Sequence, residues 1–137
     1  MNGRGIRFGV AVALIGAAGL GACSEGPQEV YVGMATAAQM GDLQGFLDGF
    51  TKESQPLIQA QIALSEAYDL KNDSPVRQLV FDSVEKVETE GDVSILDVSS
   101  GGRKQRIKMV QTEDGWRIDV KVLAEFWDAQ KGGGAAK

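Results

Sequence analysis

Apolar residues recur at helical spacing through the first part of the chain and at every second position further on. Residues 27–40 have apolar side chains every three to four positions, and Gly41 ends this run. A second run begins after Asp42, which can cap a short helix, and a third spans residues 54–70. Beyond Pro75 the period is close to 2, which predicts strands. The apolar residues expected on the second and third helices are Leu43, Phe46, Leu47, Phe50, Leu57, Ile58, Ile62 and Leu64.

Turn-forming dipeptides divide residues 76–122 into four strands, because pairs of this kind favour two-residue hairpin loops. The turn signals are Gly91-Asp92, Gly101-Gly102 and Asp114-Gly115. Such loops fix a register that can be checked against the side chains. The apolar residues that this register aligns on one face are Val87, Leu96, Ile107 and Val122. The residues aligned on the other face, which alternate in charge, are Lys86, Asp97 and Arg106.

The predicted fold class is α+β, with N-terminal helices packed on a four-stranded antiparallel meander sheet in a cone-like arrangement. We place this single domain at residues 27–131. One face of the sheet is expected to be buried and the other solvated. The third predicted strand carries the cations Arg103, Lys104, Arg106 and Lys108. We interpret them as part of a solvated charge ladder, because Asp97 and Glu88 share the predicted outer face.

The end of the chain combines an amphipathic stretch with a glycine-rich segment. Apolar residues recur from Val122 to Trp127, and residues 132–137 are expected to form a flexible tail. Phe126 and Trp127 are adjacent, so a helix directs them about 100° apart and a narrow apolar face cannot cover both. We expect Phe126 to close the core and Trp127 to lie against a helix with its indole N–H in water. The alternative is that Trp127 contacts a partner, because aromatic residues are enriched in binding hot spots.

The first 22 residues are typical of a bacterial export signal. Two arginines precede the run Phe8–Ala22, which contains only apolar residues and glycine and is short for a membrane-spanning helix. The run leads into Leu20-Gly21-Ala22-Cys23, which resembles the lipobox of bacterial lipoproteins. Small side chains suit a peptidase that cuts between Ala22 and Cys23, and the Cys23 thiol can carry the lipid.

Lipidation at Cys23 is expected to hold the domain on a membrane, because two or more acyl chains anchor a protein stably. Residues 23–26 then form a short tether in front of the domain. Ser24 stands where an aspartate favours retention in the inner membrane of many Gram-negative bacteria. The expected location is therefore the periplasmic face of the outer membrane.

Composition narrows the classes of partner and of chemistry. The chain has a formal net charge of -5, and removal of the signal leaves 12 Lys and Arg against 19 Asp and Glu. An acidic protein gains nothing from counterion release on DNA or RNA, so nucleic acid is disfavoured as a partner. The chain has no His, and its one Cys is assigned to the lipid, which excludes His-dependent triads, thiol chemistry and His- or Cys-ligated zinc. No motif implies a cofactor or another metal site.

One set of residues suggests a ligand pocket. The register places Glu85 on the inner face of the sheet, beside Val98 and Gln105. A carboxylate in an apolar cavity can act as a general base or bind a ligand, and Tyr31 and Tyr68 on the covering helices could donate hydrogen bonds. The alternative is that Glu85 lies in water at the rim of the sheet and that both tyrosines are core residues with hydrated hydroxyls.

Two segments support a resemblance to a known superfamily. Ala37–Leu43 closes the first helix, and Glu113–Asp119 forms a hairpin of sequence Glu-Asp-Gly-Trp-Arg-Ile-Asp. Together with the helices and the meander, they resemble small bacterial lipoproteins of the nuclear transport factor two-like superfamily, which has a cystatin-like cone fold. That superfamily includes ketosteroid isomerases, polyketide cyclases and noncatalytic binding domains, so the resemblance implies a fold and no single function. Its enzymes use an Asp or an Asp-His pair inside the cone, and no residue of this sequence matches that role.

We therefore expect a membrane-anchored periplasmic domain without catalytic activity that binds an envelope protein or a small apolar ligand. The alternatives are a cone-fold isomerase or cyclase with Glu85 as general base, and a structural component of the envelope. A ligand-sized cavity on the inner face would favour pocket binding, whereas a filled core would leave contacts at the surface.

Overall fold

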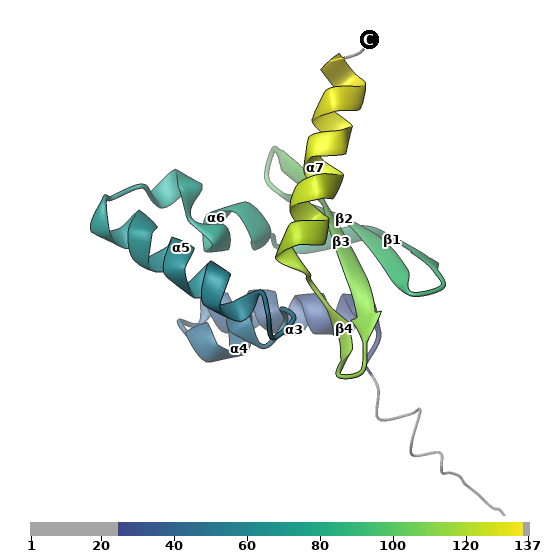
Figure 1. Ribbon diagram of the computed structural model, residues 1–137, viewed down its shortest axis with the longest axis horizontal. Helices are drawn as coiled ribbons and strands as arrows, with labels where there is room; N and C mark the ends of the chain where they lie inside the picture. Colours follow the sequence, from purple (N-terminus) through teal and green to yellow (C-terminus); the bar gives the residue numbers. More distant parts are fainter. Residues whose placement is uncertain (1–24, 136–137) are drawn as a thin grey trace, which may run out of the picture.

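The computed structural model describes residues 25–135, so the predicted signal peptide and Cys23 lie outside the described residues (Figure 1). Helices precede a four-stranded antiparallel sheet of order β1-β2-β3-β4, which confirms the predicted α+β class. The elements are α3 (Pro27–Gln39), α4 (Leu43–Leu47), α5 (Gln55–Ala67), the 3-10 helix η2 (Lys71–Asp73), α6 (Pro75–Leu79), β1 (Ser83–Glu90), β2 (Val93–Ser100), β3 (Arg103–Thr112), β4 (Gly115–Arg117) and α7 (Val120–Ala135).

Capping interactions determine where the first helices begin. Pro27 occupies the first turn of α3, where its missing N–H costs no hydrogen bond. The Asp42 carboxylate accepts a hydrogen bond from the Gly45 N–H (3.0 Å) and so caps α4, as predicted. Ser54 precedes α5, but its hydroxyl accepts a hydrogen bond from the Val120 N–H (2.9 Å) instead. Ser54 therefore links the helical half of the chain to the start of α7.

The segment after Pro75 corrects the prediction of a strand from residue 76 onward. Residues 75–79 form helix α6, and the strand β1 begins only at Ser83. The Ser74 hydroxyl accepts a hydrogen bond from the Val76 N–H (3.3 Å), and Pro75 is well suited to a first helical turn. A helix of five residues is too short to establish a helical period in the sequence.

Helix α5 has two kinds of apolar side chain. Ile58 and Ile62 are buried, whereas Leu57 and Leu64, which belong to the same predicted helix, are 47% and 55% exposed. Leu57 and Leu64 are seven residues apart and therefore share one side of the helix. That side faces away from the core.

From Lys86 onward, the register of the first three strands is the predicted one. Val87 lies opposite Leu96, and Leu96 lies opposite Ile107. On the other face Asp97 lies opposite Arg106, and their side chains form an ion pair with an N–O distance of 3.0 Å. The turn residues and the side-chain alternation together specified this part of the sheet.

The third hairpin differs from the prediction by one residue. Its turn residues are Glu113 and Asp114, and Gly115 follows the turn with a φ of +109°. A glycine at this point is typical of hairpins in which a residue with positive φ follows the turn. The Thr112 hydroxyl stabilises the turn, because it donates to the Gly115 carbonyl (2.9 Å) and accepts from the Asp114 N–H (3.1 Å). The sheet register after this hairpin shifts accordingly.

Helix α7 begins at Val120 and is separated from the end of β4 by two residues, so Val122 is helical and does not complete the predicted apolar row. The Asp119 carboxylate accepts hydrogen bonds from the N–H groups of Lys121 (3.0 Å) and Val122 (3.2 Å) and thereby caps the helix. Helix α7 continues to Ala135, so residues 132–135 are helical, and the flexibility expected of residues 132–137 stays a prediction. Within residues 25–135 no helix combines the length and the apolar character that a membrane span requires.

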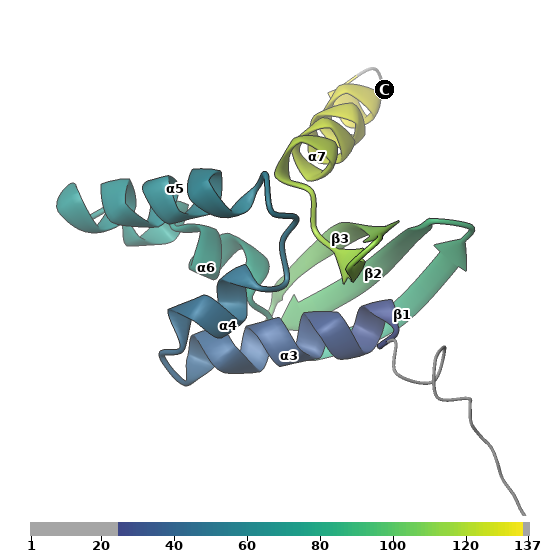
Figure 2. The same ribbon diagram turned by 60° about the horizontal axis from the view of Figure 1, so that its bottom comes forward.

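The core lies between α3 and the inner face of the sheet (Figure 2). Leu96, Ile107 and Met109 are fully buried on that face and pack in one cluster with Tyr31 and Met34 of α3. These side chains fill the part of the inner face that α3 covers. Gln105, on the same face near the start of β3, is only half-buried.

Two glycines allow α4 to approach α3 closely. A Cβ atom on Gly49 would lie 2.9 Å from the Met34 Cβ, and one on Gly45 would lie 2.6 Å from the Ala37 Cβ. Both distances are shorter than real Cβ atoms show. The missing side chains of these glycines therefore make room for helix packing.

Candidate functional site

Glu85, the predicted pocket carboxylate, does not lie on the inner face. The register of β1 and β2 shifts between Val84 and Lys86, so Val84 takes the place opposite Val98 that was predicted for Glu85. A bulge of this kind adds one residue to a strand and redirects its side chains. Glu85 is exposed, and its carboxylate accepts a hydrogen bond from the Ser99 hydroxyl (2.5 Å). The prediction of an inward-facing carboxylate is therefore wrong.

The two tyrosines predicted to line the pocket differ in burial. Tyr31 is 1% exposed, and its hydroxyl donates to the Leu79 carbonyl (2.6 Å) and accepts from the Phe81 N–H (3.0 Å). Burial raises the pKa of Tyr31 to about 12. Tyr68, at the C-terminal end of α5, is 71% exposed. Tyr31 therefore has a structural role, and its hydroxyl is bonded to the backbone instead of being hydrated.

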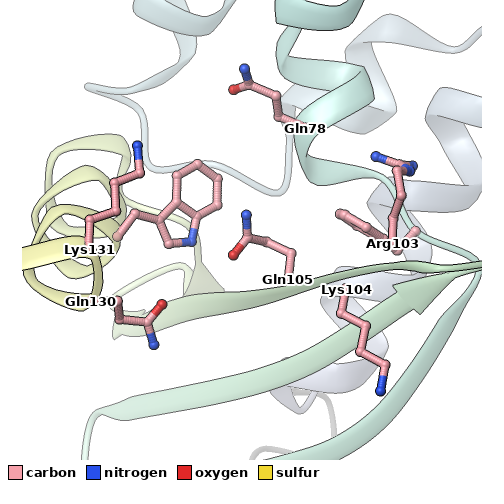
Figure 3. Close-up of a pocket in the computed structure, with 8 residues that line it drawn as sticks. Gln78, Arg103, Lys104, Gln105, Gln130 and Lys131 are labelled. Carbon is pink, nitrogen blue, oxygen red and sulfur yellow. The ribbon is translucent and has the colours of Figure 1, made fainter. Parts of the chain in front are cut away.

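A cleft of about 700 Å³ lies outside the core, between α6, the first residues of β3 and α7 (Figure 3). We call it the Trp127 cleft. Gln105 is half-buried there and lies opposite Val98 in the sheet, as predicted. The residues that line the cleft are Gln78, Phe81, Arg103, Lys104, Gln105, Trp127, Gln130 and Lys131. Of the predicted site residues, the structure brings Gln105 and Trp127 together and leaves Glu85, Tyr31 and Tyr68 elsewhere.

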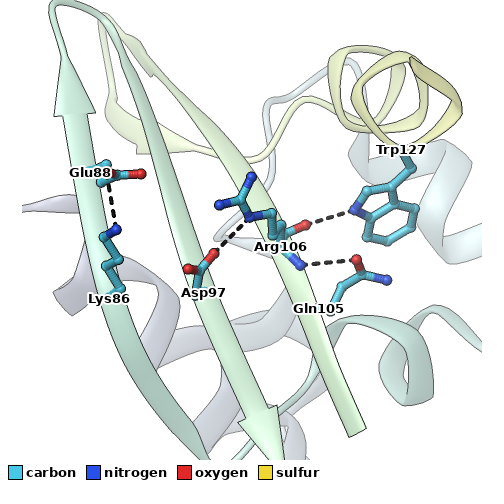
Figure 4. Close-up of polar contacts among 6 residues, drawn as sticks. All are labelled: Lys86, Glu88, Asp97, Gln105, Arg106 and Trp127. Carbon is cyan, nitrogen blue, oxygen red and sulfur yellow. Dashed lines mark hydrogen bonds and ion pairs between the residues drawn. The ribbon is translucent and has the colours of Figure 1, made fainter. Parts of the chain in front are cut away.

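The position of Trp127 follows from the short last strand. β4 pairs only with residues 110–112, so the earlier part of β3 has no strand on that side. The indole N–H of Trp127 donates to the Arg106 carbonyl (2.7 Å), and the Gln105 side-chain oxygen accepts from the Arg106 N–H (2.9 Å) (Figure 4). The Trp127 and Gln105 side chains thus form the hydrogen bonds to the Arg106 backbone that a longer β4 would form.

This contact corrects the prediction that Trp127 lies against a helix with its N–H in water. Trp127 contacts strand β3 instead, and both Phe126 and Trp127 are half-buried against the core cluster. The Lys108 ammonium lies over the Phe126 ring, 5.6 Å from its centroid. The hydrogen bond fixes the indole ring at the wall of the cleft.

The cleft is cationic. Three of its eight lining residues carry a positive charge, and none carries a negative charge. The Arg103 guanidinium lies 4.6 Å from the Phe81 ring centroid and donates to the Arg77 carbonyl (3.0 Å). Arg103 is therefore a half-buried part of the cleft wall and does not belong to the solvated ladder in which it was predicted. Arg106 remains in that ladder through its pair with Asp97.

Four lining residues escaped the sequence analysis: Gln78, Phe81, Gln130 and Lys131. Gln78 lies on α6, a helix that was not predicted, and Lys131 lies on the part of α7 that follows the amphipathic stretch. Their spacing in sequence carries no motif. Within the described residues no group of three His, Cys, Asp or Glu side chains could hold a metal ion.

The structure therefore defines a small α+β domain with a filled core and a cationic cleft beside the open edge of β3. No protein-family model matches the chain, and no curated protein matches it. Among solved structures it is similar to an NTF-2 like protein of unknown function from Shewanella oneidensis MR-1. That match has a TM-score of 0.37 and 11% sequence identity, and it covers 66% of this chain and 89% of the other. Similarity at this level does not establish membership of a family.

Proposed function

We propose that this chain is a lipid-anchored protein of the bacterial envelope whose domain binds a ligand noncatalytically in the Trp127 cleft. The observation that carries the binding function is the cleft itself. Its volume of about 700 Å³ is within the range of small-molecule sites. Two of its eight lining residues are aromatic and the other six are polar or charged, so the cleft can offer a ligand both an apolar surface and hydrogen bonds.

The cleft is held in shape before any ligand arrives. Trp127 is fixed by its hydrogen bond to Arg106, and Arg103 by its contacts with Phe81 and the Arg77 carbonyl. Side chains that are already immobilised lose less conformational entropy on binding. This preorganisation supports a binding role for the cleft.

The two alternative functions have weaker support. An isomerase or cyclase that uses Glu85 has lost its geometric basis, because Glu85 is exposed and bonded to Ser99. A structural envelope component would need no preorganised cleft. We therefore retain the binding function and test the structural alternative with the ligand experiment below.

The anchor is inferred from the sequence, since residues 1–24 lie outside the described residues. It is tested by expression of the full chain in a Gram-negative host, separation of inner and outer membranes, and intact mass measurement. We expect a lipidated product that begins at Cys23 and is found in the outer membrane. Cys23→Ser should abolish lipidation, and Ser24→Asp should move the protein to the inner membrane. Unchanged mass and fractionation of Cys23→Ser would contradict the anchor.

The binding function is tested by mass spectrometry of small molecules released from the purified protein. Trp127→Ala should remove a compound that copurifies with the wild-type protein. Tyr68→Ala is the matched control, because it deletes an exposed aromatic side chain that does not line the cleft. Thermal denaturation shows whether Trp127→Ala is still folded. If it is not, Gln130→Trp is used in its place, because this exposed residue lines the cleft and a larger side chain there would fill it. Equal recovery of all compounds from folded cleft variants and from the control would contradict the proposal.

A further inference from the structure

We propose that the Trp127 cleft takes a small organic anion with a flat apolar part, such as an aromatic carboxylate, sulfonate or phosphate. This inference rests on the proposed binding function and specifies the chemistry of the ligand. The first argument is the contrast in charge between the cleft and the rest of the chain. The chain has a net charge of -5, whereas the cleft has three cations and no acid among its lining residues. A cleft of one charge sign raises the local concentration of ligands of the opposite sign.

Arg103 and Lys131 are available to a ligand. Neither forms an ion pair with another residue in the part of the chain that the structure describes. Arg103 uses one guanidinium nitrogen on the Arg77 carbonyl, and a guanidinium has five N–H donors in all. Its planar group can therefore still bind a carboxylate, sulfonate or phosphate oxygen.

Lys104 contributes little positive charge to the interior of the cleft, although it is one of the lining residues. Its side chain extends to the other side of the sheet from Gln105 and Gln78 (Figure 3). There it also lines a second groove that contains Glu85 and Asp97. The proposal therefore depends on Arg103 and Lys131, which lie at opposite ends of the cleft with Gln105 between them (Figure 3).

The apolar part of the ligand is inferred from the aromatic residues. Phe81 and Trp127 both line the cleft, but Phe81 is only 5% exposed and lies under the Arg103 guanidinium, so the half-buried Trp127 provides the accessible aromatic surface. A flat apolar group can stack on or against such a ring. The amide of Gln105 lies beside Trp127, and its N–H₂ group offers donors to an anion, while its oxygen accepts from the Arg106 N–H (Figure 4). An anion without an apolar part would leave the aromatic surface unused.

The test measures binding of naphthalene-1,5-disulfonate by isothermal titration calorimetry. The protein is purified as the cell makes it and, if it is lipidated, placed in phosphatidylcholine nanodiscs, with empty discs as the blank. The neutral 1,5-dihydroxynaphthalene has the same ring without the charges. We expect the disulfonate to bind and the neutral compound to bind at least about tenfold more weakly, because charged hydrogen bonds are lost.

Two variants with the same net charge test whether the charge that matters for binding lies in the cleft. Lys131→Glu should weaken disulfonate binding about tenfold, whereas Lys121→Glu should leave it unchanged, because Lys121 lies at the other end of α7 and does not line the cleft. Arg103→Gln should also weaken binding. Equal weakening by the two lysine variants, equal affinity for the neutral compound, or no binding of the disulfonate would overturn the inference.

These outcomes are separable from failure of the proposed function. If the wild-type protein copurifies with a neutral compound or a protein partner that the Trp127 variant loses, the inference of an anionic ligand is overturned, but the cleft is still a binding site. A copurified organic anion that is lost in both Lys131→Glu and the Trp127 variant would support both.

Discussion

Tyr31→Phe tests the structural role of a residue that had been predicted to line a pocket. The hydroxyl links α3 to the junction of α6 and β1, through the Leu79 carbonyl (2.6 Å) and the Phe81 N–H (3.0 Å). Phenylalanine keeps the ring and its packing but removes the hydroxyl. Leu79 and Phe81 are 4% and 5% exposed, so water has little access to the two backbone groups that lose their partner.

The expected loss of stability follows from these two groups. A buried donor or acceptor that is left unsatisfied costs about 1 to 3 kcal/mol. Part of this cost is offset, because the variant no longer has to desolvate a hydroxyl. We therefore expect the free energy of unfolding to fall by roughly 2 to 4 kcal/mol in denaturant titrations. Tyr68→Phe is the control, since its side chain is 71% exposed and should change stability by less than about 0.5 kcal/mol.

The raised pKa adds a dependence on pH. Folding raises the pKa of Tyr31 from 10.0 to about 12, because burial disfavours the charged phenolate. The corresponding stability is fully present below pH 10 and is lost as the pH rises toward 12, by about 3 kcal/mol. Tyr31→Phe should lack this loss. A variant as stable as wild type, with the same alkaline unfolding, would refute the assigned role of the hydroxyl.

Three further substitutions test other parts of the fold. Gly49→Ala should destabilise by about 1 to 3 kcal/mol in the same titration, because its Cβ would lie 2.9 Å from the Met34 Cβ, and a neutral effect would show that α4 moves freely. Leu96→Ala should cost about 2 to 5 kcal/mol, since Leu96 is fully buried between β1 and β3. Trp127→Phe should lower the melting temperature by a few degrees, because it leaves the Arg106 carbonyl without the indole donor; an unchanged melting temperature would count against a preorganised cleft.

The sequence was most informative where turn chemistry and side-chain alternation agreed. The glycine-containing turns fixed the pairing of Val87 with Leu96 and of Leu96 with Ile107, and the charges of Asp97 and Arg106 matched that pairing. A shift of one residue would have moved the apolar residues to the wet face, so this register was strongly specified.

The errors arose where one residue changed the local geometry. The bulge at Glu85 redirects that side chain, and a bulge leaves no clear signal in a strand of charged residues. The capping carboxylate of Asp119 ends the sheet and starts α7, although the valines that follow it favour a strand. The missed helix α6 was too short to show its period.

The cleft was predictable only in part. Trp127 and Gln105 were recognised as candidates, but for separate reasons and in separate places. Their proximity depends on the length of β4 and on the start of α7, which together place the Trp127 indole against the Arg106 carbonyl. Lys131 and Gln78 enter the cleft from two elements that the sequence did not define. The site is therefore created by tertiary packing and does not correspond to a local sequence motif.

The most direct test of the account uses fluorine NMR of the protein labelled with 5-fluorotryptophan. The chain has two tryptophans, so the spectrum should contain one signal from the buried Trp116 and one from Trp127, and Trp127→Phe assigns them. Naphthalene-1,5-disulfonate should shift the Trp127 signal in a saturable manner and leave the Trp116 signal in place, and Lys131→Glu should weaken this response. A Trp127 signal that does not respond to the disulfonate or to the compound that copurifies with the protein would contradict a binding function of the cleft.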